Sequence, residues 1–448
     1  MPAFWTVRNL NDAGVDSLRW AIEQAHAHAD TEHVVRFDFG LTGLISLRSA
    51  LPLLVEKFEF QGNGANVLAV ERNPAVAAKF RIFEVDLDKE VTIKDLTIRG
   101  GDVTAGGAIG NGGGIWNRGK LRLENCVVND NTADEGGGIY NGANQSAELT
   151  LINTIVSVNV ARRGGGGIAN PWQGRVEVKG GSFISENVAG TAGGGIYNGQ
   201  GSLIIENSTV ELNNASGHGG GIFNAWGLYA LRSTVSFNRA DGTSDGGGLY
   251  NSGNAVLANS TVSTNWANEG AGVFTKANAI TRLRGVTGAA NDALDSGVFF
   301  GTGGGLYVEA QGTLELVNTI VASNTASAAP DVAGTVTSLG RNLVGIGTGS
   351  GGWVGTDQVG TNAMPIDARL SLLDYYGGPT ATHLLLAGSP ALDAGDNARA
   401  VGLTDQRGLA RIVNGTVDIG AVEMQAGEIG AEFYQSLTAL PVSKRRKR

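Results

Sequence analysis

The sequence predicts an all-β fold, a single-stranded right-handed parallel β-helix in which the chain winds as a solenoid. A glycine-rich motif recurs at intervals of 24 to 33 residues. Intervals of this length are typical of coils that bury their apolar face only by stacking on their neighbours. A second motif in each repeat alternates apolar and polar residues over short runs, as strands do. No long stretch inside the array keeps helical spacing, so helical repeats are excluded.

The composition agrees with an ordered solenoid. Of 448 residues, 70 are glycine, 42% are hydrophobic and only 17% are charged, whereas disordered chains combine high charge with low hydrophobicity. The net charge of −9 argues against a general nucleic-acid or anionic-membrane binder. The single cysteine, Cys126, excludes an internal disulfide framework and thiolate metal clusters. No apolar run reaches the length of a membrane span, so no transmembrane segment is predicted.

The chain divides into four regions. Residues 1–40 predict a strand, a turn and a helix, because the apolar residues from Leu18 to Ala25 follow helical spacing after a capping Asp16 or Ser17. This helix is expected to cover the open edge of the first coil. Residues 41–335 are the repeat array, residues 336–424 a C-terminal capping or anchor-like module, and residues 425–448 a tail with a basic end. No secretory signal opens the chain, and the basic end is either solvated or an address or anionic-surface contact.

The repeats also predict how the coils stack. Equivalent residues of neighbouring coils lie about 4.8 Å apart, so each residue stacks on its counterparts. The aliphatic residue after each glycine run is expected to form an internal column, at Ile115, Ile139, Ile168, Ile196, Ile222 and Leu249. The last asparagine of the second motif is expected to form a hydrogen-bonded ladder, at Asn131, Asn159, Asn187, Asn213, Asn238, Asn265 and Asn324. The glycines supply positive φ angles and allow close backbone approach.

Motifs at both ends of the array resemble a known group of proteins. The opening TVRNLNDAGVDSLRWAIEQA, the GGGIYN and NSTVxxN coils, and the closing GGPTATHLLLAGSPALDAG, TDQRG and VDIGAVE resemble bacterial extracellular β-helix proteins. These carry a choice-of-anchor C-terminal module and have the pectin-lyase-like fold. The GGAI motif at 106–109 also resembles the repeats of polymorphic outer-membrane adhesins, although their FxxN companion motif is not regular here. The resemblance implies the fold and an extracellular or cell-surface location, but no particular reaction.

Fold alone does not decide whether the chain is an enzyme, because pectin-lyase-like folds host polysaccharide lyases and hydrolases. Gly217-His218-Gly219 matches a short polygalacturonase signature, but the other segments of that signature are not found in order. The turns before the glycine runs carry groups suited to acid–base chemistry, namely Asp134, Glu135, Arg162, Arg163, His218, Arg239, Asp245 and Glu269. They are either catalytic candidates or a solvated surface with complementary charges. No metal or other cofactor is indicated; Ca²⁺ is conceivable at these aspartates, but no known calcium-loop spacing supports it.

A column of aromatic residues follows the internal aliphatic column. These residues are expected to point outward, and they are Trp116, Tyr140, Tyr197, Phe223, Tyr250, Phe274 and Tyr307, with Ala169 as the exception. Stacked rings stabilise a sheet through cross-strand pairing, and a flat aromatic row also offers a platform for sugar rings. Both interpretations remain open from the sequence.

The residues favour a structural or adhesive protein that is secreted or attached to the cell surface. It is expected to be a monomer and to recognise polysaccharide or another cell-surface component. The alternative is a polysaccharide-active lyase or glycoside hydrolase with a site on the exposed face of the coils. A structural spacer without a ligand is a third hypothesis. An enzyme is expected to gather several ionisable groups with shifted pKa values, whereas an adhesive protein is expected to present a long, shallow surface.

Overall fold

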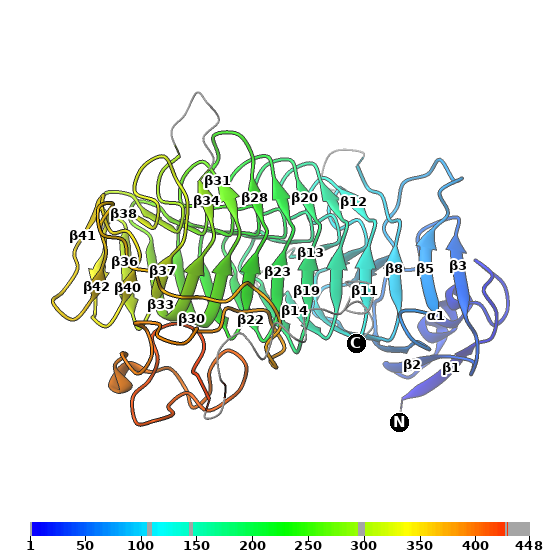
Figure 1. Ribbon diagram of the computed structural model, residues 1–448. Coiled ribbons are helices and arrows are strands. Elements are labelled where there is room, and N and C mark those ends of the chain that lie inside the picture. The colour runs from blue at the N-terminus through cyan, green and yellow to red at the C-terminus, as the bar shows by residue number, and fades with distance from the viewer. Residues whose placement is uncertain (1, 105–109, 143–146, 294–300, 426–427, 429–448) are drawn as a thin grey trace.

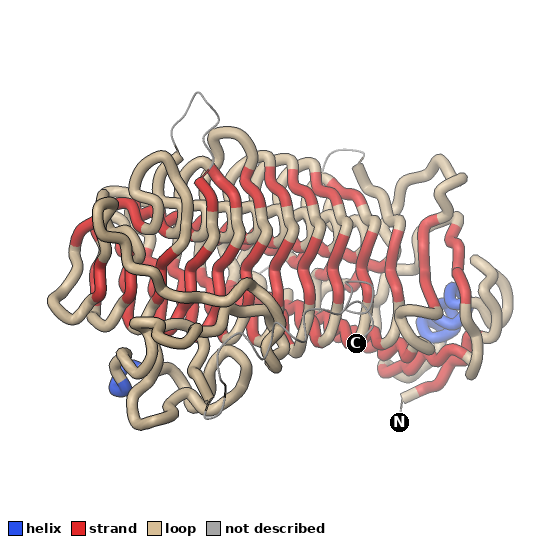
Figure 2. Tube along the Cα trace, viewed as in Figure 1, coloured by secondary structure: helices blue, strands red, loops and turns tan. Residues whose placement is uncertain are grey.

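The chain forms one elongated parallel β-solenoid, and the predicted fold class is confirmed (Figure 1). The computed structural model describes residues 2–104, 110–142, 147–293, 301–425 and 428. The GGAI motif at 106–109 and the basic end at 444–448 lie outside the described residues. Figure 2 shows the strands standing in rows along the solenoid, joined by turns and with very little helix. Among the described helices, none has the length and apolar character needed to cross a membrane.

The strands of the described residues form three parallel sheets. Sheet 1 has 24 strands and supplies two strands to most coils. Its strands are β1 (Ala3–Val7), β2 (Glu32–Phe37), β3 (Gly43–Leu47), β4 (Lys57–Gln61), β5 (Leu68–Arg72), β7 (Glu90–Lys94), β8 (Thr97–Arg99), β10 (Lys120–Glu124), β11 (Val127–Asn129), β14 (Glu148–Ile152), β15 (Ile155–Ser157), β18 (Arg175–Lys179), β19 (Phe183–Ser185), β22 (Ser202–Glu206), β23 (Thr209–Glu211), β26 (Gly227–Leu231), β27 (Thr234–Ser236), β30 (Asn254–Ser263), β33 (Ile280–Ala289), β36 (Thr313–Val317), β37 (Ile320–Ala322), β39 (Thr337–Ser338), β40 (Leu343–Val344) and β42 (Gln358–Val359).

Sheets 2 and 3 complete each coil. Sheet 2 carries the residues that follow the glycine runs, in β6 (Phe83–Val85), β9 (Ile115–Asn117), β13 (Ile139–Asn141), β17 (Ile168–Asn170), β21 (Ile196–Asn198), β25 (Ile222–Asn224), β29 (Leu249–Asn251), β32 (Val273–Thr275), β35 (Leu306–Val308), β38 (Val332–Thr335) and β41 (Ser350–Gly351). Sheet 3 is short and comprises β12 (Thr132–Ala133), β16 (Val160–Ala161), β20 (Val188–Ala189), β24 (Asn214–Ala215), β28 (Arg239–Ala240), β31 (Trp266–Ala267) and β34 (Asp292–Ala293).

The predicted internal columns are present. The aliphatic residues of sheet 2 pair in register, as Ile139 does with Ile115 and Ile168, and they are fully or almost fully buried. The first two glycines of a run are glycine for different reasons, the first because of its backbone conformation and the second because of close packing. Gly136 has φ of +63°, which side chains rarely adopt, and a Cβ on Gly137 would lie 2.5 Å from the main-chain oxygen of Gly166 in the next coil.

Two asparagine ladders run through the solenoid. In the predicted ladder each Nδ2 donates to the Oδ1 of the next coil, as from Asn159 to Asn187 at 3.0 Å, and the ladder ends on the carboxylate of Asp331. It also includes Asn291, which the motif did not reveal. A second ladder joins the last residues of the GGGIYN motifs, at Asn117, Asn141, Asn170, Asn198, Asn224 and Asn251. Both ladders satisfy buried polar groups at coil corners.

The N-terminal end is covered as predicted. Helix α1 (Leu18–Ala27) packs against β1 and β2 and buries its apolar face. The hydroxyl of Ser17 caps it by accepting from the main-chain N–H of Trp20 at 3.2 Å. At the other end the solenoid continues beyond the predicted boundary at residue 335, because β39 to β42 still pair with the preceding coils.

The C-terminal segment, residues 360–425, returns along the outside of sheet 1 rather than forming a separate body (Figure 1). It contains the short helix η1 (Asn397–Arg399), and it reaches back to strands more than 100 residues earlier. Asn259 on β30, for example, donates to the main-chain oxygens of Val401 and Thr404. Ile320 and Ala322 of β37 share an apolar cluster with Leu385, Ala391 and Ile419.

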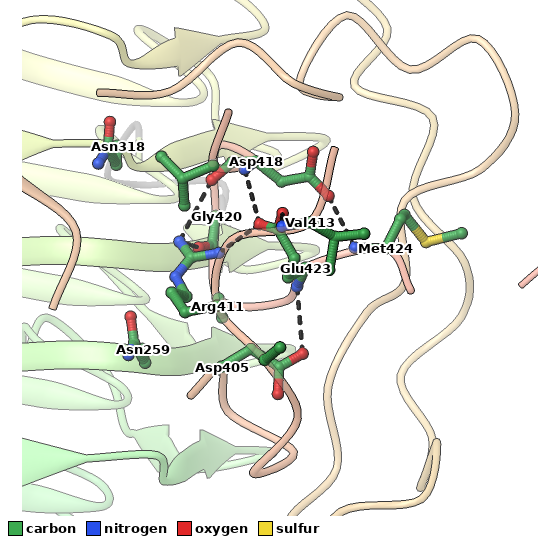
Figure 3. A network of polar contacts seen from close by, with 12 residues as sticks. Asn259, Asn318, Asp405, Arg411, Val413, Asp418, Gly420, Glu423 and Met424 are labelled. Atoms are coloured by element: carbon green, nitrogen blue, oxygen red, sulfur yellow. Dashed lines mark hydrogen bonds and ion pairs between the residues drawn. The ribbon is translucent and has the colours of Figure 1, made fainter. Parts of the chain in front are cut away.

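A buried ion pair fixes this segment (Figure 3). Arg411 donates to the carboxylate of Glu423 at 3.3 Å and to the main-chain oxygen of Gly420 at 2.6 Å. Glu423 also accepts from the main-chain N–H groups of Val413 and Asp418, at 2.7 and 2.8 Å. Because both charged groups are removed from water, either one alone would leave an uncompensated buried charge.

Candidate functional site

The residue before each glycine run lies in one column on the outside of the solenoid. Main-chain hydrogen bonds between adjacent coils set the register: the N–H of Gly193 donates to the oxygen of His218, that of Gly219 to Asp245 and that of Gly246 to Glu269. In coil order the column contains Glu135, Gly164, Ala192, His218, Asp245, Glu269 and Thr302. Gly164 and Ala192 have no polar side chain, so they divide the column into two charged patches.

The first patch consists of Asp134, Glu135, Arg162 and Arg163. The guanidinium of Arg162 lies 3.6 Å from the carboxylate of Asp134, and that of Arg163 lies 3.7 Å from Glu135. Both arginine side chains are mostly exposed, at 60% and 69%. Each carboxylate of the first patch therefore faces an exposed arginine, although Asp134 itself is buried.

The second patch brings together His218, Asp245 and Glu269 from three consecutive coils. The imidazole of His218 stacks on the ring of Tyr250, with 4.5 Å between centroids. Its Nδ1 accepts a hydrogen bond from the main-chain N–H of Asp245 at 3.0 Å. The same nitrogen lies 3.4 Å from the Asp245 carboxylate, but because it accepts, the contact is not a salt bridge. Burial, with a smaller effect of Lys276, lowers the pKa of His218, which agrees with a neutral ring.

Two carboxyl groups of the second patch have raised pKa values. Burial, and then the charge of Glu269, raises the pKa of Asp245 to about 7. Burial, and then the charge of Glu309, raises the pKa of Glu269, which is within hydrogen-bonding reach of the Tyr307 hydroxyl. These shifts have the two causes that most often act at functional sites, which are desolvation and a neighbouring like charge.

Two members of the second patch were missed by the sequence analysis. Lys276 and Glu309 directly follow β32 and β35, at equivalent positions of adjacent coils. The ammonium of Lys276 is within reach of the Tyr250 hydroxyl, and Glu309 accepts from the main-chain N–H of Ala277 at 2.8 Å. A comparison of the residues that follow each GGGIYN motif would have found them, because charged residues appear there only at Arg118, Lys276 and Glu309.

The aromatic column borders the second patch and is a continuous stack. From Tyr197 through Phe223, Tyr250 and Phe274 to Tyr307, successive ring centroids are 5.0 to 5.2 Å apart and the planes differ by 3° to 7°. The rings therefore cover one another's faces, and Phe274 is only 2% exposed. The flat platform for sugar rings that the sequence suggested is not formed in this stack, because each ring face between Phe223 and Phe274 is covered by a neighbouring ring.

Toward the N-terminus the aromatic column is not a continuous stack. Ala169 interrupts it and is itself buried, and Trp116 meets Tyr140 edge to face at 6.3 Å. The indole N–H of Trp172 donates to the hydroxyl of Tyr140 at 3.2 Å. Of the remaining predicted candidates, Arg239 lies on sheet 3 and pairs with Asp241 at 2.5 Å, so it belongs to neither patch.

The arrangement allows two kinds of chemistry. Three carboxyl groups, one ammonium group, one imidazole and two phenols from successive coils can bind the hydroxyl groups of a polar ligand. A carboxyl group with a pKa near neutrality can also donate a proton. Among the described residues, no group of three or more His, Cys, Asp or Glu side chains is placed to hold a metal ion.

Comparisons with known proteins add the following. No family model matches the chain, and no curated protein matches it. Among solved structures, pectate lyase Pel9A is similar to it, with a TM-score of 0.47 and 13% identity over 95% of this chain and 97% of that chain. A likeness at this level supports no statement about activity.

Proposed function

We propose that the protein is a secreted or cell-surface β-solenoid that binds a polysaccharide through the second patch. The observation that carries this proposal is the set of carboxyl groups from adjacent coils that form no ion pair with an arginine of the described residues, whereas the first patch has one arginine for each carboxylate. Desolvated carboxylates without a paired arginine destabilise a protein, so their presence favours a role in binding.

The chemistry of the patch suits sugar hydroxyls. Carboxylates accept hydrogen bonds from hydroxyl groups, and the hydroxyl of the partly buried Tyr307 can both donate and accept. Because each coil advances about 4.8 Å, equivalent groups repeat along the axis at a spacing that an extended polymer can follow. A linear ligand running along the solenoid would contact several coils at once.

One observation favours a glycoside hydrolase as the second candidate. The pKa of Asp245 is raised to about 7, so a fraction of the molecules carries its proton at neutral pH, and Glu269 lies in the next coil. Glycosidases use one carboxylic acid as proton donor and a second carboxylate as base or nucleophile. A lyase is less well supported, since it needs cationic groups to stabilise charge on a uronate, and the patch offers only Lys276 among described residues.

The two candidates are separated by one experiment. The protein is passed through gels containing neutral, amino-sugar or uronate polysaccharides, and soluble fractions are assayed for reducing ends and for absorbance at 232 nm. Retardation by at least one polysaccharide without product release supports binding. If the wild type releases products and Asp245→Asn does not, the protein is a hydrolase and not only a binding protein. If absorbance at 232 nm rises as well, the reaction is that of a lyase. The absence of both retardation and product overturns both candidates.

A further inference from the structure

A second group of oxygen-bearing side chains lies on the outer face of sheet 1, away from the second patch. Thr209 and Glu211 point outward from β23, because Val210 between them is fully buried inside. Glu211 pairs in register with Ser236 on β27, as Thr209 does with Thr234. Three oxygen-bearing side chains, of Thr209, Glu211 and Ser236, therefore lie beside one another on adjacent strands.

The C-terminal segment covers this part of the sheet. Thr380 donates to the main-chain oxygen of Arg232 at 3.2 Å, and Thr234 donates to that of Ala381. Further along the same row, the hydroxyl of Thr261 bonds to Gln406 and that of Ser263 to His383. Outward hydroxyls on these coils are thus normally satisfied by the segment.

Two hydroxyls are exceptions to this pattern. Thr209 and Ser236 are each 1% exposed, and within the described part of the chain neither Thr209 Oγ1 nor Ser236 Oγ has a hydrogen-bond partner. A buried hydroxyl without a partner costs stability and usually indicates a bound water or ion. Thr209 lies two residues before Glu211 on the same strand, and Ser236 lies opposite Glu211 on the adjacent strand.

The Glu211 carboxylate is also uncompensated. No ion pair joins it to a lysine, arginine or histidine of the described residues. Burial, and then the charge of Glu186, raises its pKa. Burial and the charge of Glu211 both raise the pKa of Tyr375, which places that phenol in the same electrostatic environment. The site therefore combines negative charge with unused oxygen atoms.

We propose that Thr209, Glu211 and Ser236 bind a hard metal cation of the size of Ca²⁺ beneath the C-terminal segment. All the donors are oxygens, which Ca²⁺ prefers, and its flexible coordination number lets water complete the shell. Mg²⁺ fits less well, because it demands a near-ideal octahedron. The cation would satisfy both hydroxyls and the carboxylate, and it would fasten the C-terminal segment to the solenoid.

Thermal unfolding of the full-length protein tests this directly. We expect Ca²⁺ to raise the melting temperature by a few degrees, Mg²⁺ to raise it less, and Glu211→Gln to abolish the shift. Without metal, Glu211→Gln is expected to be at least as stable as the wild type, because the substitution removes an uncompensated carboxylate. Glu148→Gln is the matched control on the same sheet, since the ion pair of Glu148 with Lys120 is exposed.

Terbium luminescence provides a second measurement. Tb³⁺ bound next to Tyr375 is expected to emit when tyrosine is excited, and Tyr375→Phe to reduce that emission while the Ca²⁺ shift persists. Absence of a Ca²⁺ shift in the folded wild type, or an equal shift in Glu211→Gln, would overturn the proposal and assign the two hydroxyls to a bound water.

Discussion

The first and second patches lie in equivalent turns of the repeat, just before the glycine runs, and they differ in how their charges are balanced. In the first patch Arg162 and Arg163 face Asp134 and Glu135 from the next coil. In the second patch Asp245 and Glu269 follow one another in adjacent coils, and neither forms an ion pair with an arginine that the structure describes. The scaffold is identical in both, so the difference comes from a few side chains.

This comparison separates what the fold requires from what it permits. The glycines, aliphatic residues and asparagines are constrained by stacking, and they occur in both regions. The residue type before each glycine run is not constrained by the coil, and only some coils carry a charge there. Where it is neutralised, it forms an ordinary surface, and where it is left desolvated and unpaired, it is a candidate for binding.

The largest contrast is expected from the aromatic rings beside the two patches. Phe274 is sandwiched between Tyr250 and Tyr307, whereas Trp116 is half-buried and meets one ring edge to face. We expect Phe274→Ala to lower the free energy of unfolding by about 3–5 kcal/mol. Trp116→Ala is expected to cost less, and denaturant titration of both variants measures the difference. Equal losses of unfolding free energy in the two variants would show that the stacking of Phe274 between two rings adds no stability.

A pH dependence is expected from the second patch. The pKa of Asp245 is about 7 in the folded protein and 3.8 ordinarily, so the folded state holds its proton more tightly. This contribution is complete below about pH 4 and is lost as the pH rises toward 7, amounting to at most about 4 kcal/mol. The free energy of unfolding should therefore fall over this interval.

Asp245→Asn is expected to flatten that decline, whereas Asp134→Asn should retain the wild-type slope. Unfolding free energies at pH 4, 5, 6 and 7 measure it. A wild-type slope that survives in Asp245→Asn would show that another group causes it.

The smallest effect is expected in the first patch. Its ion pairs are exposed on the arginine side, so Arg162→Ala and Arg163→Ala should each cost less than about 1 kcal/mol. Added salt should reduce the cost further. A larger loss, insensitive to salt, would mean that the arginines stabilise the coil by packing rather than by charge.

The sequence predicted the parts of the molecule that depend on a repeated residue type. The Ile115 column and the asparagine ladder were predicted because each coil uses the same residue at the same place. Asn291 was missed because its coil lacks the full motif. His218, Asp245 and Glu269 were predicted as candidates because they precede glycine runs, but their separation from Arg162 and Arg163 depended on the register of the coils.

Other features depend on contacts that no local pattern reveals. The stacking of Tyr250 on Phe274 decides that ring faces are hidden, and the spacing of the motif alone does not distinguish stacked from splayed rings. The environment of Glu211 is set by a segment that returns from more than 160 residues later along the chain, as the neighbouring Tyr375 shows. Such long-range contacts are fixed by tertiary packing and not by periodicity.

We propose that the second patch binds a polysaccharide through carboxyl groups that form no ion pair with an arginine of the described residues. The most direct test is a calorimetric titration of the polysaccharide that retards the wild type, comparing two matched double variants. We expect Asp245→Asn with Glu269→Gln to weaken binding at least about tenfold, which corresponds to about 1.4 kcal/mol. Asp134→Asn with Glu135→Gln is expected to leave the dissociation constant unchanged. Equal affinities in both double variants, with both proteins folded, would contradict the claim.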